Sequence, residues 1–554
     1  MYLKKKPLLI ITFLWIFVGL LAACNFTGSE KTAEQSADNA DPSASTDKNS
    51  KPQGQVLRTI AGDEIASLDI VKAHDAISGV VISNTMEGLY GIDKNHEPVL
   101  AGASKHEVSE DGLVHTFTLR DNVWSNGDPV TAYDYEYSWK RTFEEVGYYT
   151  YSFANAKILN AQAIMDGEKS PEELGIKAID DKTLVVTLEG PSPLLNYSLA
   201  FTAFFPVNQA FVEEAGDSYG TEYDKVLYNG PFMLTDWQHD QGWTYKKNPN
   251  YREADMVKLE EINVSVVKDE STAVNLYEAG KVDLIEVSSA FIDRYKSDPN
   301  YTASVTAGLK FLRFNHNNTY LANENIRRAL DMAWDKKSLT DVILKNGSIP
   351  TYYLVPDIAK APSGETFRSL NGDFTGTIEE AQNYFKQGLE ELGVDSIELN
   401  VLAADDTVNR DTAEYLKAQW EQNLDGLTIN IEIQPFQSRL EREKAIEYDI
   451  SLSSYIPSSA DPLNYLDMWV TGKSFNRMDY SNLDYDELIN KAWSELDEEK
   501  RYNLMLEAEK MLFDDAAIGP MYQDATAIIR KPYVKDVVHH PTLPQYDYKW
   551  AYIE

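Results

Sequence analysis

Cysteine is nearly absent from this chain, with a single residue, Cys24, among 554. One thiol excludes a disulfide framework and any zinc or iron–sulfur site that needs several cysteines. The eight histidines are scattered apart from His539 and His540, and neighbours on a strand point to opposite faces. The folded part must therefore hold together by packing, and we expect neither a metal nor a cofactor.

Positive charge is also scarce, because 51 Lys and Arg stand against 88 Asp and Glu, for a formal net charge of −37. Such a balance repels polyphosphate, so no nucleic-acid partner is expected. The chain lacks the motifs HExxH, G-x-S-x-G, Walker A and the glycine-rich dinucleotide fingerprint. We therefore expect the protein not to be an enzyme, although an exported hydrolase with a carboxylate pair is an alternative class.

One long apolar run is present, at residues 8–21, directly after three lysines at positions 4–6. A basic start followed by a short apolar run is typical of an export signal, and the run is short for a span of about 20 residues. It ends in Leu-Ala-Ala-Cys at residues 21–24, which resembles the lipobox of bacterial lipoproteins. We expect a signal peptide over 1–23 and lipidation of Cys24, which would attach the protein to the extracytoplasmic face of the cell membrane.

Residues 24–54 are poor in large apolar side chains, and Phe26 is the one exception after the cysteine. Such a segment cannot bury enough surface to order itself, so it is expected to be a disordered tether. A flexible chain of that length has a reach of about 30 Å, enough to hold a folded body away from a membrane.

The remaining chain has the pattern of alternating strands and amphipathic helices that predicts an α/β protein. Alternating apolar residues at 427–433 predict a half-buried strand, directly after a helix with Leu416, Trp420 and Leu424 on one face. Further helices are expected over 325–345 and 498–513, and a strand over 518–530, with residues 326, 329, 330, 333, 339, 342 and 343 on the inner face of the first helix.

Residues 111–141 carry consistent local signals. A strand over 114–120 leads to an Asn-Gly-Asp-Pro turn at 126–129, and Thr131 precedes Asp134 by three residues, as a helix N-cap does. We expect a helix over 133–141 whose Tyr133, Tyr137 and Trp139 pack against the core.

At this stretch the chain resembles the oligopeptide-binding family of extracytoplasmic solute-binding proteins, the receptors of peptide-importing ABC transporters. The resemblance covers about 55–554. Its motifs are PVLA (98–101), SEDG (109–112), FTLRD (117–121), WSNGDPVTAYDYEYSWKR (124–141), GIKAIDDKTLVVTL (175–188), YNGPFML (228–234), NPNY (248–251), FNHNN (314–318), NIRRALDMAWDK (325–336) and DPLNYLDMW (461–469).

The resemblance implies a two-lobe, periplasmic-binding-protein-like clamshell of type II, cluster C, with an extra subdomain in the first lobe. The implied division is 55–98, 222–308 and 518–554 for the core of lobe I, 99–221 for its extra subdomain, and 309–517 for lobe II. It also implies an oligopeptide ligand held through its backbone as an added strand, a membrane permease as partner, and a monomer.

By alignment with that family, two segments would grip the peptide. The first is His74, Asp75 and Ala76, although His74 could equally be an ordinary exposed polar residue. The second is Ser453, Ser454, Tyr455, Ile456 and Ser458, followed by Asp461. Phe436 and Tyr455 stand where relatives often have Trp and would flank side-chain pockets, or they could simply be core residues; Tyr522 is a further candidate.

The second segment departs from the family at Ser458, where many relatives have an Asp that pairs with the α-amino group of the peptide. Three interpretations remain open: Asp461 takes over, the N-terminus is not held by charge, or the ligand is blocked or placed differently. We hypothesise specialisation for a hydrophobic or signalling peptide. Leu452 and Glu443 replace basic residues that bind the peptide carboxylate in some relatives, which leaves Asn409 and Arg410 as candidates.

Other functions are compatible with the same features. Within this fold family, nickel, haem or oligosaccharide are alternative ligands, because a fold does not fix its ligand. A sensing or adhesive surface lipoprotein without transport is a third possibility.

Overall fold

The computed structural model describes residues 54–554 except 458 and 543. The predicted signal peptide, Cys24, nearly all of the tether and Ser458 lie outside the described residues. Within the part that is described, no helix has both the length and the apolar character needed to cross a membrane.

The first lobe, defined here as the body around one large hydrophobic core, contains two four-stranded sheets. One has the order β1 (Val56–Ala61), β10 (Glu261–Val266), β9 (Gly242–Lys247), β8 (Phe232–Gln238), with only the β1–β10 pair parallel. The other is antiparallel, in the order β4 (Ala103–Val108), β5 (Val114–Leu119), β7 (Thr183–Thr187), β6 (Ile176–Asp180). A single core cluster joins both sheets and takes in the chain end, through residues 534–553.

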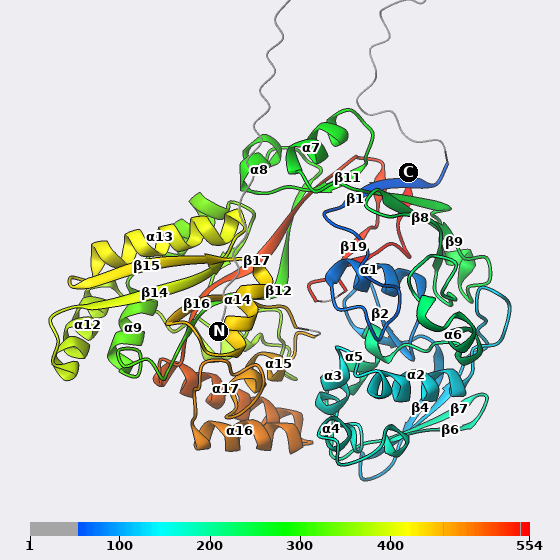
Figure 1. The fold of residues 1–554 in the computed structure, drawn as a ribbon, viewed down its shortest axis with the longest axis horizontal. Helices are drawn as coiled ribbons and strands as arrows, with labels where there is room; N and C mark the ends of the chain where they lie inside the picture. The colour runs from blue at the N-terminus through cyan, green and yellow to red at the C-terminus, as the bar shows by residue number, and fades with distance from the viewer. Residues whose placement is uncertain (1–53, 458, 543) are drawn as a thin grey trace, which may run out of the picture. The chain divides into compact units, whose positions relative to one another are not determined.

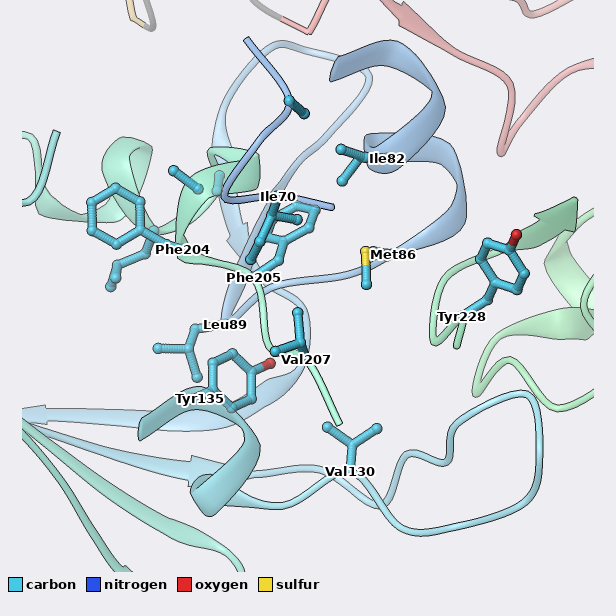
Figure 2. Packing of buried hydrophobic residues seen from close by; sticks show 14 of the residues in the cluster. Ile70, Ile82, Met86, Leu89, Val130, Tyr135, Phe204, Phe205, Val207 and Tyr228 are labelled. Atoms are coloured by element: carbon cyan, nitrogen blue, oxygen red, sulfur yellow. The ribbon is translucent and has the colours of Figure 1, made fainter. Parts of the chain in front are cut away.

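Helix α2 (Ala132–Glu144) begins as predicted, because the Asp134 carboxylate accepts a hydrogen bond from the Thr131 N–H at 2.8 Å. Its inner face matches the prediction in part. Trp139 is buried and Tyr137 packs against the core as predicted, whereas Tyr133 is 49% exposed. The first lobe's core lies on the side of the helix that carries Tyr135, which is buried in its place and is shown with its cluster in Figure 2.

The second lobe is built on a mixed sheet. Its strand order is β11 (Leu284–Glu286), β17 (Ile518–Arg530), β12 (Tyr301–Phe314), β16 (Ile450–Tyr455), β14 (Ile397–Ala404), β15 (Leu427–Gln434), with the short β13 (Ile349–Pro350) beside β17. Two core clusters lie within residues 309–522, with Leu194 from the first lobe added to one of them.

Strands β12 and β17 are the long connection shared by both lobes, and they run side by side in Figure 1. Their pairing is interrupted between Val305 and Leu309. Side chains fill the gap: Thr306 donates to the Asp524 carbonyl at 3.1 Å, and the Gln523 amide donates to the Thr306 carbonyl at 2.7 Å. At this interruption, side-chain hydrogen bonds replace the backbone hydrogen bonds between β12 and β17.

Most predicted elements of the second lobe are confirmed. Strand β15 follows helix α13 (Thr407–Asn423), and α17 (Glu498–Asp514) and β17 match the predicted spans closely. The single helix predicted over 325–345 is wrong. Helix α9 ends at Met332, and Asp335 caps a new start by accepting a hydrogen bond from the Ser338 N–H at 3.1 Å, which leads through α10 (Lys336–Ser338) into a π-helical segment, Leu339–Leu344.

Other elements complete the two lobes. They are α1 (Ala76–Thr85), α3 (Thr150–Asn155), α4 (Ala161–Met165), α5 (Leu195–Leu199), α6 (Gln209–Ala215), α7 (Glu270–Glu278), α8 (Ser289–Tyr295), α9 (Glu324–Met332), α11 (Phe367–Asn371), α12 (Ile378–Leu392), α14 (Phe436–Lys444), α15 (Leu463–Leu466), α16 (Leu483–Ser494), β2 (Tyr90–Ile92), β3 (Pro98–Leu100), β18 (Val534–Lys535), β19 (Val538–His539), β20 (Tyr546–Asp547) and β21 (Tyr552–Ile553).

Candidate functional site: an aromatic cleft between the lobes

A cavity of about 450 Å³ is lined by residues of both lobes. The first lobe contributes His74, Tyr148, Tyr149, Tyr151, Ser152, Asn155, Leu194, Ser198, Phe201 and Phe204. The second contributes Phe436, Ser454, Tyr455, Ile456, Leu463, Asn464, Asp467, Met468, Lys473, Ser474, Phe475 and Trp493. We call this cavity the cleft. Its walls are predominantly aromatic and apolar.

The predicted first segment enters the cleft through His74, directly before helix α1. The His74 ring is 5.6 Å from that of Tyr148, and its Nδ1 is 3.0 Å from the Lys72 carbonyl oxygen. Asp75 caps the helix, because its Oδ1 accepts a hydrogen bond from the Ser78 N–H at 2.8 Å. Its Oδ2 is buried and has no hydrogen-bond partner in the structure. Ala76 lines a different cavity.

Tyrosines just before and at the start of α3 form much of the first lobe's wall. Tyr149 meets Phe201 edge-on at 4.9 Å, and the Tyr151 ring lies 6.3 Å from Phe475 of the second lobe. Burial raises the pKa of Tyr149 to about 12, so its phenol stays neutral at physiological pH. This wall was missed in the sequence, although the run Tyr-Tyr-Thr-Tyr at 148–151 is a visible signal of an aromatic cluster.

The predicted second segment is the end of strand β16. On one side, Ser453, Ser454 and Tyr455 pair with β12. On the other side, the pairing with β14 ends at Ser451. Within the described residues, the end of β16 therefore has one backbone edge without a strand partner, beside the cleft-lining residues Ser454, Tyr455 and Ile456.

Glu443 serves the fold beneath this strand and has no place in the cleft lining. Its side chain is 2% exposed, and it accepts hydrogen bonds from Arg439 and Ser451, both at 2.7 Å, and from Ser453. Burial alone would raise the pKa of Glu443, but the charges of Arg313 and Arg439 lower it overall. Leu452 is buried in the second lobe's core.

Phe436 and Tyr455 both line the cleft, as the interpretation of side-chain pockets requires. Phe436 begins helix α14 and is 59% exposed, with the Arg439 guanidinium 5.3 Å from its ring. Tyr455 meets Phe475 edge-on at 5.8 Å. Whether either ring contacts a ligand stays a prediction.

Seven of the described site residues predicted from the sequence lie outside the cleft lining: Asp75, Ala76, Ser453, Asp461, Asn409, Arg410 and Tyr522. Asp461 pairs with Arg501 through both carboxylate oxygens, at 2.8 and 2.9 Å. Asn409 donates to Asp406 at 2.6 Å, and Arg410 donates to the Asp405 carbonyl at 3.0 Å, both at the exposed start of α13. Tyr522 is buried in the second lobe's core.

Polar groups of the cleft gather around Asp467. Its Oδ1 accepts a hydrogen bond from the Trp493 indole at 2.7 Å, and its Oδ2 is 3.1 Å from the Lys473 ammonium. Lys157 of the first lobe lies 5.2 Å from the Trp493 ring. Asp467 is therefore already paired, and the contacts of Trp493 link the two walls.

Comparison with known proteins places this geometry in context. The family model described as "Bacterial extracellular solute-binding proteins, family 5 Middle" matches residues 97–477. The dipeptide-binding protein DppE of Bacillus subtilis is 33% identical over 537 residues, which cover 96% of this chain and 98% of that protein. The oligopeptide-binding protein OppA of the same organism is 29% identical over 547 residues, which cover 96% and 97%.

Solved structures agree with these matches. Listeria monocytogenes OppA bound to peptide is 41% identical with a TM-score of 0.79, covering 91% of this chain and 99% of that one. The pheromone receptor PrgZ is 31% identical with a TM-score of 0.79, covering 90% and 100%. The α/β, two-lobe fold predicted from the sequence is thereby confirmed.

Proposed function

Because this chain belongs to family 5 of the bacterial extracellular solute-binding proteins, we propose that it captures oligopeptides in its interlobe cleft and delivers them to the permease of an ABC importer. Relatives named for dipeptides, oligopeptides and a pheromone support a peptide as ligand. The ligand is released unchanged, and the protein acts as a monomer.

The observation that carries the proposal is the unpaired edge of β16 beside the cleft. An extended peptide can add there as a strand, and main-chain hydrogen bonds are indifferent to its sequence. Each bond contributes a net ~0.5–1.5 kcal/mol, so about six of them together with lobe closure reach micromolar affinity. Closure encloses the ligand and creates the form that a permease recognises.

The cleft favours peptides with apolar side chains, for instance a hydrophobic signalling peptide. Its walls carry Tyr149, Phe201, Phe436 and Phe475, and the carboxylates of Asp461 and Asp467 are both paired within the protein. Neither carboxylate is free to hold the α-amino group of a peptide. The peptide N-terminus is then held without a charge partner from the second segment.

The rest of the chain supports delivery at a membrane. As a member of an extracellular family, the protein works outside the cytoplasm. Lipidation at Cys24 and a tether over 24–54 would hold it at the membrane surface while it exchanges ligand with the permease. The division into lobes at about 98, 221, 308 and 517 belongs to the same proposal.

Thermal unfolding against a peptide library, followed by mass spectrometry of the ligands that co-purify, tests the function. At a hundred times its Kd, a bound peptide stabilises the folded protein by about 2.7 kcal/mol, which raises the Tm. A protein that responds to sugars, haem or nickel and to no peptide would refute the proposal.

Measuring Kd for the free and the N-formylated form of one bound peptide tests whether a carboxylate binds the α-amino group of the peptide. We expect nearly equal values, because formylation removes a charge that the second segment does not use. A large loss on formylation would show that a carboxylate captures the N-terminus.

A further inference from the structure

A second cavity, of about 370 Å³, is lined by first-lobe residues and by β11, and it borders the predicted first segment through Ala76 and Ile77. His74, two residues earlier, lines the cleft. A peptide that passes this segment therefore has one cavity on each side of Asp75. We call the second cavity the acidic pocket, after Glu286, and its other lining residues come from β1, β9, β10, β11, α7 and β20.

Glu286, at the end of β11, is the feature that makes this pocket unusual. Its Oε1 accepts a hydrogen bond from the Tyr546 hydroxyl at 2.7 Å, and no protein group among the described residues pairs with its second carboxylate oxygen. The dense protein surroundings raise the pKa of Glu286, the hydrogen bond from Tyr546 lowers it, and the neighbouring charge of Asp524 raises it. The residue is nevertheless exposed to solvent, so the cation of a ligand can reach its carboxylate.

The other charged groups of the pocket are already used. Lys268 is 2.9 Å from Asp63, so its ammonium is directed to that surface carboxylate. Glu270 accepts hydrogen bonds from the Ser288 N–H and, at 2.5 Å, from the Ser288 hydroxyl. Among the charged groups that line this pocket, Glu286 is thus the one with a carboxylate oxygen that no described protein group binds.

Aromatic rings line the same space as Glu286. Trp243, Tyr245, Tyr546 and Tyr548 all line the pocket, and Tyr546 and Tyr548 are nearly parallel, with an interplanar angle of 13°. The Trp243 side chain is 4% exposed. Aromatic faces attract cations.

We propose that the acidic pocket binds a cationic group of the captured peptide, an alkylammonium or guanidinium, through Glu286 and the surrounding aromatic rings. This inference rests on the proposed function and adds a selectivity to it. The cleft accepts apolar side chains, whereas the acidic pocket selects peptides with a positive charge at the position that reaches past Ala76. The charge comes from a Lys or Arg side chain.

The test uses one neutral peptide that the protein binds and a set of derivatives. Each derivative carries lysine at one position, and its partner carries acetyl-lysine there, which keeps the length and removes the charge. Every peptide is made with a free and an acetylated N-terminus. Kd is measured by calorimetry for the wild type, Glu286→Gln and Glu110→Gln; the last removes the same charge from an exposed position. Thermal unfolding verifies that each variant is folded.

We expect one lysine position to bind about tenfold tighter than its acetyl-lysine partner, as for a hydrogen bond to a charged group. Glu286→Gln should abolish this preference without loss of the neutral peptide, and Glu110→Gln should keep it. If acetylation of the N-terminus weakens binding and no lysine position does, the bound charge is the α-amino group, and the preference for a cationic side chain is overturned. Equal binding of all pairs, or a preference that survives Glu286→Gln, would overturn the inference. Binding of no peptide at all would instead overturn the proposed function.

Discussion

Carboxylates around the cleft fall into two groups, those whose oxygens are paired within the protein and those with an oxygen left for a ligand. Asp461 and Glu443 belong to the first group, since each is held by arginine. Asp75 and Glu286 belong to the second. A ligand charge is compensated most favourably at a carboxylate that has no other partner, so the second group is where selectivity is expected.

Asp461→Ala is expected to lower stability and to leave recognition of the peptide N-terminus unchanged. The substitution leaves the Arg501 guanidinium buried without its partner, which costs about 3–5 kcal/mol. Urea unfolding measures the loss, and the ratio of Kd for free and N-acetylated peptide measures recognition. A ratio far from one in the wild type that returns to one in the variant would show that Asp461 holds the α-amino group after all.

Glu443→Gln is expected to destabilise the protein in a pH-dependent way. Its folded-state pKa is lowered, so the ionised form stabilises the fold above the ordinary value of 4.5, and this contribution is lost as pH falls through the folded-state pKa. The difference in Tm between wild type and variant should therefore be largest at neutral pH and narrow below pH 4.5. A constant difference across this range would contradict the assignment.

At the scale of secondary structure, the end of β16 and the gap between β12 and β17 have complementary roles. The first presents an unpaired edge to the cleft. At the gap, side-chain hydrogen bonds of Thr306 and Gln523 replace the backbone hydrogen bonds between the strands. The Tyr465 hydroxyl also donates a hydrogen bond to the Ala307 carbonyl at 2.9 Å. Such a gap lets the long strands bend where both lobes depend on them.

Thr306→Val is expected to destabilise this gap. The hydroxyl donates to the Asp524 carbonyl and accepts from the Gly308 N–H, both at 3.1 Å, and valine removes both contacts at similar size. Leaving these backbone groups without that partner should lower the free energy of unfolding by about 1–3 kcal/mol, as measured by urea unfolding. Thr306→Ser keeps the hydroxyl and is the matched control; equal loss in both variants would assign the effect to packing.

Considered as a whole, the described residues form one compact unit with separate cores in its two lobes. The cleft joins residues as distant in sequence as His74 and Trp493. Its volume therefore depends on how the lobes meet, and a ligand that stabilises the closed state changes the surroundings of every side chain on the walls.

Trp493→Phe is expected to remove most of the intrinsic fluorescence change that peptide binding produces. Among the ten tryptophans, Trp493 lines the cleft and contacts both Asp467 and Lys157. Fluorescence titration with a bound peptide measures the effect. Trp550→Phe, at a site outside the cleft lining, should keep the signal; loss of signal in Trp550→Phe alone would place the responsive indole elsewhere.

The sequence by itself determined the local elements and the family. Strand β15, helix α17 and the Thr131–Asp134 helix start depend on contacts within a few residues, which periodicity and capping patterns record. The family motifs also led to His74 and to Ser454, Tyr455 and Ile456 on the two walls.

Only the tertiary structure decided which of these side chains are free to act. For Asp461, one of three interpretations that the sequence left open for the peptide N-terminus, the structure shows a pairing with Arg501, 40 residues away. Tyr135 is buried where the sequence predicted Tyr133. Glu286 accepts a hydrogen bond from Tyr546, which lies 260 residues further along the chain. Pairing and burial between distant segments follow from packing in three dimensions, and no local pattern encodes them.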